Sequence, residues 1–158
     1  MSIRVSNLSF SYGEKPLLVE ANFRIEDGQK VGLVGENGTG KSTLLKLFRG
    51  EEYADDGDLT INGTMELVPQ EVKRDPILDS ASTVMEYVNP DGEKEEHEIR
   101  KLFDGFGIPQ IDLNTVPRTY SGGVKTKFAL ARALFKEPDI LLLDEPTNHF
   151  DMESSQSL

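Results

Sequence analysis

The sequence predicts an α/β fold with a largely parallel β-sheet. Segments with strand character alternate with segments of helical periodicity, which is the order typical of such folds. Two strand-like segments, residues 30–35 and 139–143, are apolar on both faces, as expected of strands buried inside a sheet. A glycine-rich loop joins the first of them to a helix predicted to begin at Lys41.

The N-terminal part of the chain is predicted to begin with strands. Ile3 and Val5 alternate with polar neighbours in IRVSNLSFSYG, and Gly13 ends that segment. NFRIEDG predicts a second short strand, closed by a turn at Asp27–Gly28. The helix that follows the glycine-rich loop is predicted to end at Gly50. Its buried side is formed by Leu44, Leu45, Leu47 and Phe48.

The middle of the chain changes from strand to helix. DLTINGTMELV predicts a β-hairpin, because Asn62–Gly63 is a favoured two-residue turn. Thr83, with a glutamate three residues later, indicates the start of a short helix. Residues 93–107 form an acidic amphipathic helical pattern, so a mostly helical segment is expected from about residue 72 to 117. The apolar positions of that pattern are Ile99, Leu102, Phe103 and Phe106.

A further helix is predicted from Ser121, with Pro138 just beyond its end. The apolar run DILLL then forms the last predicted strand. The face of this helix predicted to be buried consists of Val124, Phe128, Ala131, Leu134 and Phe135.

The composition of the chain excludes several classes of protein. The chain has 158 residues, 37% hydrophobic and 28% charged, which is typical of one soluble domain. The lack of cysteine excludes disulfides and thiolate metal sites, and agrees with a cytoplasmic location. No apolar run reaches the length of a membrane helix, and the N-terminus lacks a secretion signal.

The net charge of −11 repels nucleic-acid phosphates. Binding to nucleic acid would therefore need a local basic patch, and a solvated helix face is the simpler interpretation of the basic residues present. The candidates for such a patch are Arg118, Lys125, Lys127, Arg132 and Lys136.

GENGTGKST fits the phosphate-binding loop pattern G-x-x-x-x-G-K-[ST] and lies between a predicted strand and a predicted helix. Glycines let the backbone curl so that N–H groups point at phosphate oxygens, and the helix start adds partial positive charge. Lys41 can reach the β- and γ-phosphates, and the Ser42 hydroxyl can bind Mg²⁺. The alternative is a glycine-rich turn without a ligand. The candidate binding residues are Gly35, Asn37, Gly38, Thr39, Gly40, Lys41, Ser42 and Thr43.

Two acidic residues follow the last apolar strand. Asp144 is expected to hold Mg²⁺, directly or through water, beside the phosphate loop. Glu145 is expected to orient the attacking water or accept its proton, as a catalytic base. Acidic residues after an apolar strand alone usually mark a loop entrance, and it is their combination with the phosphate loop that indicates phosphoryl transfer.

The phosphate loop, the segment YSGGVKTKFALARALF and the segment LLLDEPTNHFD together resemble the ATP-binding-cassette (ABC) ATPases over nearly the whole chain. DEPTNHFD is more similar to the F subfamily, the soluble translation-factor and antibiotic-resistance type, than to transporter subunits. The resemblance implies a P-loop NTPase sheet with an N-terminal antiparallel β subdomain and a helical insert. Its expected parts are a nucleotide-binding core, residues 1–71 and 118–158, and a helical subdomain, residues 72–117.

The resemblance also implies roles for single residues. Tyr12 would stack on the adenine of ATP, and Gln70 would contact Mg²⁺ and the catalytic water. The signature residues Ser121, Gly122 and Gly123 would meet the γ-phosphate of an ATP bound by a second ABC domain, in tandem or in a homodimer. Asn148 to Asp151 would link the two sites. Two positions depart from the usual signature, with Tyr120 in place of leucine and Val124 in place of a polar residue.

The function implied is Mg²⁺-dependent ATP hydrolysis in the cytoplasm, with the ribosome as a partner and no insertion into a membrane. Family members continue with a strand that ends in a switch histidine, a position that neither His97 nor His149 occupies. The chain is therefore expected to be C-terminally truncated and to hydrolyse ATP weakly. Two alternatives remain open, which are the ATPase subunit of a membrane transporter and a dimerisation switch that binds ATP without hydrolysing it.

Overall fold

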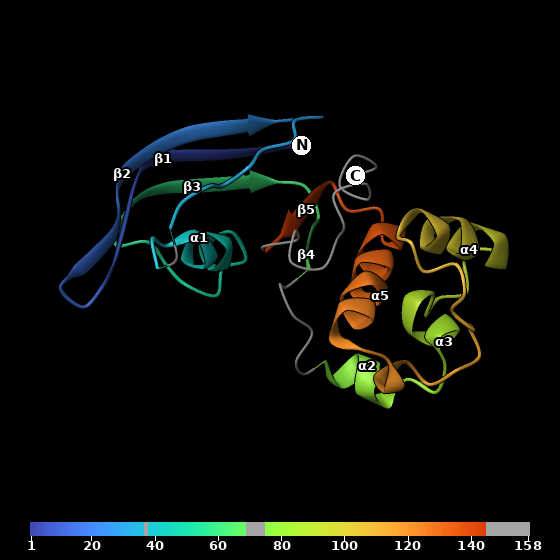
Figure 1. Cartoon of the computed structure of the whole chain (residues 1–158). Helices are drawn as coiled ribbons and strands as arrows, with labels where there is room; N and C mark the ends of the chain where they lie inside the picture. The colour runs from blue at the N-terminus through green and yellow to red at the C-terminus, as the bar shows by residue number, and fades with distance from the viewer. Residues whose placement is uncertain (37, 69–74, 145–158) are drawn as a thin grey trace. The chain divides into compact units, whose positions relative to one another are not determined.

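The computed structural model describes residues 1–36, 38–68 and 75–144. The chain divides into two compact units, Met1–Met65 and Glu66–Leu158, and each is described by itself. Figure 1 shows a β-sheet with one helix in the first unit and a group of helices in the second. The predicted combination of strands and helices in an α/β fold is thus confirmed. The largest sheet among the described residues is antiparallel, so the prediction of a largely parallel sheet is wrong for this part of the chain.

The first unit is built on a three-stranded antiparallel sheet with the strand order β2-β1-β3. Its strands are β1 (Ser2–Tyr12), β2 (Lys15–Glu26) and β3 (Asp56–Asn62), and its helix is α1 (Lys41–Phe48). Phe23 of β2 meets Phe48 of α1 with ring centroids 6.3 Å apart, so the helix packs on the sheet. The buried residues of this unit's core are Ile3, Val5, Leu8, Phe10, Leu44, Leu47 and Phe48.

A bulge in β1 explains why residue 57, in the neighbouring strand β3, is a glycine. The register between β1 and β3 shifts between Ser6 and Ser9, and Asn7 within the shift has a φ of 49°. Gly57 lies opposite, and a Cβ atom there would come within 2.3 Å of the Asn7 carbonyl oxygen. Only glycine allows the two backbones to approach so closely.

The second unit combines a two-stranded sheet with helices. The sheet pairs β4 (Met65–Val68) with β5 (Ile140–Leu143). The backbone N–H of Asp144 donates to the Val68 carbonyl at 3.1 Å, so the C-terminal ends of both strands lie at one edge. The helices are α2 (Pro76–Ser80), α3 (Val84–Val88), α4 (Glu96–Gly105), a 3₁₀ turn (Pro117–Thr119) and α5 (Gly122–Phe135).

The core of the second unit forms around α5. Phe128 of α5 is fully buried, stacks on Phe103 of α4 with centroids 5.6 Å apart, and meets the edge of the Tyr120 ring at 5.3 Å. Burying each such ring contributes roughly 1.5–3 kcal/mol. Ile99 and Phe106 are also buried, so the amphipathic pattern predicted for residues 93–107 is confirmed. No helix among the described residues has the length and apolarity that crossing a membrane requires.

Two sequence predictions about strands are wrong. Residues 30–35 form no strand and are exposed, with 93% of Val34 accessible, because no described strand lies beside them to complete a hydrogen-bonded ladder. Asn62–Gly63 does not close a hairpin, because β3 pairs with β1 while β4 pairs with β5. In both cases the choice of pairing partner overrides the local sequence pattern.

Candidate nucleotide-binding site

The predicted phosphate loop lies in the first unit, between the exposed segment 30–35 and α1. The Lys41 ammonium group donates to the carbonyl oxygens of Gly35 at 2.7 Å and Glu36 at 2.9 Å. The Glu36 carbonyl also accepts from the Thr39 hydroxyl at 2.8 Å and from the Thr39 N–H at 3.3 Å. The loop is therefore closed on itself, and a positive charge is held against its first two peptide groups.

Glycines make this loop geometry possible. Gly38 and Gly40 have φ values of 82° and 97°, in the region that side chains with a Cβ disfavour. Gly35 is needed for space, because a Cβ atom there would lie 2.8 Å from the Thr39 hydroxyl oxygen. Of the predicted phosphate-loop residues, Asn37 alone falls outside the described residues.

The start of α1 carries no side-chain cap. Gly40 occupies the N-cap position and supplies no side-chain hydrogen bond to the first N–H groups of the helix. In contrast, α2 and α3 are capped by the side chains of Asp75 and Thr83. The uncapped end of a helix presents N–H donors and partial positive charge, and both favour a phosphate group.

The predicted adenine-stacking residue, Tyr12, lies at the end of β1 in the same unit. Its ring is 47% exposed and meets the edge of the Phe10 ring at 4.9 Å, while its hydroxyl donates to Glu52 at 2.9 Å. The ring is therefore held by the Phe10 ring and by the hydrogen bond of its own hydroxyl, and part of its surface is exposed to solvent.

The predicted signature residues lie in the second unit, at the start of α5. Ser121 is the N-cap residue, its side chain makes no capping hydrogen bond, and both Ser121 and Gly122 are exposed. Gly123 is the second residue of the helix and is partly buried. The Tyr120 hydroxyl lies 2.6 Å from the Thr115 hydroxyl, which fixes the backbone just before the helix. The open helix start is thus anchored on its N-terminal side.

The predicted metal ligand Asp144 directly follows β5. Its hydrogen bond to Val68 places it at the edge of the sheet where β4 also ends, and the chain beyond β4 leads toward Gln70. Gln70 and Glu145 themselves lie outside the described residues. The structure therefore brings Asp144 and the strand that leads to Gln70 to one sheet edge.

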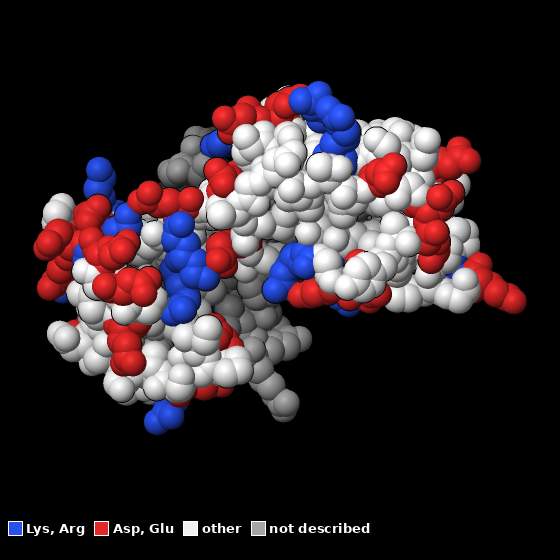
Figure 2. Space-filling model, turned by 180° about the vertical axis from the view of Figure 1, so that it is seen from behind, with Lys and Arg blue, Asp and Glu red and all other residues white. Residues whose placement is uncertain are grey.

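The basic residues considered as a nucleic-acid patch are largely occupied by partners within the unit. Lys127 donates to the Phe106 carbonyl at 2.7 Å, Arg132 donates to the Tyr87 carbonyl at 2.6 Å, and Lys136 pairs with Glu66 at 2.6 Å. On the face shown in Figure 2, acidic side chains are more widespread than basic ones. Lys127 and Arg132 are partly buried, so the expectation of a solvated helix face is wrong for these two residues.

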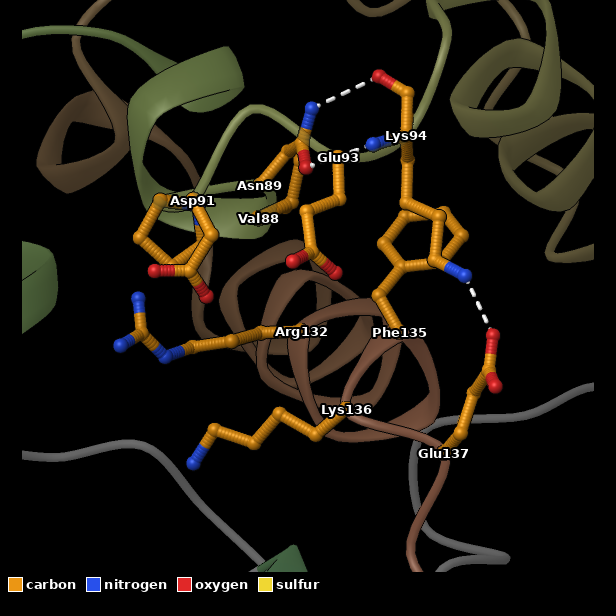
Figure 3. Close-up of a pocket in the computed structure, with 10 residues that line it drawn as sticks. Val88, Asn89, Asp91, Glu93, Lys94, Arg132, Phe135, Lys136 and Glu137 are labelled. Carbon is orange, nitrogen blue, oxygen red and sulfur yellow. Dashed lines mark hydrogen bonds and ion pairs between the residues drawn. The ribbon is translucent and has the colours of Figure 1, made fainter.

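A cavity of about 300 Å³ lies between the loop after α3 and the end of α5 (Figure 3). The Asn89 side chain accepts from the Lys94 N–H at 3.1 Å and donates to the Lys94 carbonyl at 2.8 Å, and the Lys94 ammonium pairs with Glu137. This ion pair raises the pKa of Lys94 and lowers the pKa of Glu137. The cavity is lined by both basic and acidic side chains. The acidic side chains would repel a phosphate group, so the cavity is not a candidate phosphate site.

Sequence analysis overlooked two groups in the second unit, Asp75 and Tyr87. Asp75 caps α2, and its other carboxylate oxygen accepts from the Tyr87 hydroxyl at 2.6 Å. An aspartate followed by a proline is a known start signal for a helix, and could have located α2. The contact with Tyr87 has no signal in the sequence, because it joins side chains from two separate elements.

Comparisons with known proteins identify the family of this chain. The family described as ABC transporter matches residues 18–148. The ATP-binding protein Uup of Buchnera aphidicola is 35% identical over 96% of this chain and 26% of its own length. EttA of Escherichia coli, named an energy-dependent translational throttle protein, is 35% identical over 99% of this chain and 29% of its own length. The chain thus spans less than a third of these relatives.

Solved structures give the same result for the fold. The ATP-binding subunit of an ABC transporter is 26% identical with a TM-score of 0.80, covering 99% of this chain and 71% of that one. A metal-chelate-type ABC transporter in an inward-facing conformation is 26% identical with a TM-score of 0.72, covering 98% and 64%. The α/β fold expected for a phosphate-loop ATPase is therefore confirmed.

We expect Gly40→Ala to destabilise the first unit by about 1–2 kcal/mol, the cost of a left-handed conformation for a residue with a Cβ. The new Cβ would also lie 3.4 Å from the Leu17 Cβ. The free energy of unfolding measured with urea tests this. Gly32→Ala is the matched control, because Gly32 has no positive φ and open space around it. Equal unfolding free energies for the two variants would show that the φ of Gly40 carries no cost.

Proposed function

We propose, from the premise that this chain belongs to the ATP-binding-cassette family, that it binds ATP with Mg²⁺ and takes part in ATP hydrolysis. The observation that carries the proposal is the loop at residues 35–41, where Lys41 is bonded to the carbonyls of Gly35 and Glu36 beside an uncapped helix start. Backbone N–H groups, a helix end and an ammonium group are the donors that a triphosphate requires.

The chemistry of the donor set also fits Mg²⁺. Ser42 and Asp144 would be its protein ligands, with Gln70 contacting it as the family resemblance implies. Mg²⁺ prefers few protein oxygens together with phosphates and water. When bound, the ion would neutralise charge that develops on the phosphates.

Hydrolysis would depend more on positioning the attacking water and the phosphoryl group than on covalent chemistry by the protein. Glu145 would orient the attacking water or accept its proton, while Lys41 would neutralise the transferred phosphoryl group. Ser121, Gly122 and Gly123 would offer the uncapped start of α5 to the γ-phosphate of an ATP held by a second ABC domain. In this proposal the active assembly contains two such domains, in tandem or as a homodimer.

Both compact units would then belong to one ATP-binding domain. Residues 1–71 and 118–158 would form its nucleotide-binding core, and residues 72–117 its helical subdomain. The proposal requires that Asp144 and the phosphate loop share one bound triphosphate.

For the whole protein, we propose a cytoplasmic role of the F type, acting on the ribosome. Its support is the 35% identity to EttA, whose name links it to translation, together with the segment DEPTNHFD. A second candidate is the ATPase subunit of a membrane transporter. It is favoured by the solved transporter structures that share the fold.

We expect Lys41→Ala to lower the affinity for ATP by at least about 100-fold. Lys41 would donate to both the β- and the γ-phosphate, and each hydrogen bond from a charged donor contributes roughly 1.5–3 kcal/mol. Isothermal titration with Mg²⁺ and ATP measures this. Lys46→Ala is the matched control, since Lys46 is exposed on the same helix and should leave the affinity within about twofold. Unchanged affinity in Lys41→Ala would remove the phosphate-loop assignment.

The two candidate roles are distinguished by Glu145→Gln in the natural full-length protein. If Glu145 is the base, this variant keeps ATP bound, and an F-type factor would then sediment with ribosomes in an ATP-dependent way. Lys41→Ala combined with Glu145→Gln is the control and should not co-sediment. Failure of Glu145→Gln to co-sediment, with ATP retained, would favour the transporter role.

A further inference from the structure

The Tyr12 side chain is held by two other residues of the first unit. Its hydroxyl donates to Oε1 of Glu52 at 2.9 Å, and its ring meets the edge of the Phe10 ring with centroids 4.9 Å apart. Phe10 is buried and Glu52 is partly buried, whereas nearly half of the Tyr12 surface is exposed. The ring therefore has a defined orientation and still leaves room for a planar ligand.

Glu52 lies in the loop between α1 and β3, and the backbone of this loop is fixed on both sides of it. On the helix side, the Glu51 N–H donates to the carbonyl of Lys46 in α1 at 3.0 Å. On the strand side, the Asp55 N–H donates to the carbonyl of Ser9 in β1 at 2.9 Å. The carboxylate that accepts from the tyrosine hydroxyl is therefore carried by an ordered backbone.

The same hairpin that carries Tyr12 also contacts the phosphate loop. Tyr12 pairs with Lys15 across the turn that joins β1 and β2 (Figure 1). Leu17 follows two residues later, roughly 7 Å along β2, and a Cβ atom on Gly40 would lie 3.4 Å from the Leu17 Cβ. Gly40 is the N-cap residue of α1. The Tyr12 ring and the helix start proposed for the phosphates are thus separated by a few residues of one hairpin.

The orientation of an aromatic side chain affects how well a base can stack on it. A partly exposed tyrosine whose hydroxyl has no partner can occupy several rotamers, and a ligand that needs one of them must supply the free energy of ordering the ring. A hydrogen bond to an ionised carboxylate is stronger than one between neutral groups. The bond to Glu52 therefore restricts the ring before any ligand binds.

We propose that Glu52 is a positioning residue, which orients the Tyr12 ring for stacking and so determines how much of the ATP affinity comes from the adenine base. This inference rests on the proposed function, with Tyr12 stacking on adenine as the family resemblance implies. Glu52 has no contact with the phosphates in this proposal. It therefore affects the affinity for a nucleotide and leaves the affinity for a triphosphate without a base unchanged.

The test is isothermal titration of the natural protein and of Glu52→Ala with two ligands, Mg²⁺–ATP and Mg²⁺–tripolyphosphate. We expect Glu52→Ala to lower the affinity for ATP about three- to tenfold, because the ligand must then order the ring itself. The affinity for tripolyphosphate should stay within about twofold. Equal losses for both ligands would overturn the proposal, because Glu52 would then act through α1 and the phosphate loop.

Two control variants accompany this measurement. Glu52→Gln keeps an acceptor for the Tyr12 hydroxyl, so its affinity for ATP should stay within about twofold of the natural protein. Glu51→Ala changes the neighbouring glutamate, which pairs with Arg49 at 2.6 Å, and should leave both affinities within about twofold. If either control loses as much ATP affinity as Glu52→Ala, the hydrogen bond to Tyr12 is not the cause and the proposal is wrong.

A second background shows whether Glu52 acts through the Tyr12 ring. When Tyr12 is already replaced by alanine, adding Glu52→Ala should change the affinity for ATP by no more than about twofold. A further three- to tenfold loss would mean that Glu52 contacts the ligand itself, which contradicts the proposal. If the natural protein binds neither ATP nor tripolyphosphate, the proposed function is wrong and this proposal with it. ATP binding that does not depend on Glu52 overturns this proposal alone.

Discussion

The account depends on the contact between the Lys41 ammonium and the carbonyls of Gly35 and Glu36. This contact requires a loop that turns back over the start of α1, and the turn requires the positive φ angles of Gly38 and Gly40. Once the loop has this form, a cation and an uncapped helix start lie beside each other in the sequence and in space. A triphosphate is the anion that we propose for this site, and the other proposed roles follow from where its phosphates would lie.

The second unit offers a different kind of site. Its candidate hydrogen-bond donors to a phosphate are the N–H groups at the start of α5. Asp144, the one described acidic residue proposed as a metal ligand, lies at the edge of a two-stranded sheet. The helices between them are held by a core around Phe128 and by polar contacts at Tyr87.

Sequence reasoning succeeded where the determinants are local. The cap at Thr83 and the apolar face of α4 depend on residues within a few positions of each other. It failed where distant partners decide, because Asn62–Gly63 carries the chemistry of a hairpin turn, yet β3 pairs with β1 through Ile61 and Ile3. The apolar segment 30–35 likewise lacks a neighbouring strand among the described residues. The contact of Tyr87 with Asp75 was missed for the same reason.

We propose that the phosphate loop and Asp144 share one metal-bound triphosphate, and a double-mutant cycle on Mg²⁺-dependent ATP binding tests this most directly. Ser42→Ala, Asp144→Asn and the double variant would be titrated with ATP, with Mg²⁺ and with EDTA. Two ligands of one ion should show a coupling energy of about 0.5–3 kcal/mol that disappears in EDTA. Additive losses in Mg²⁺, within about 0.3–0.5 kcal/mol, would contradict the shared site.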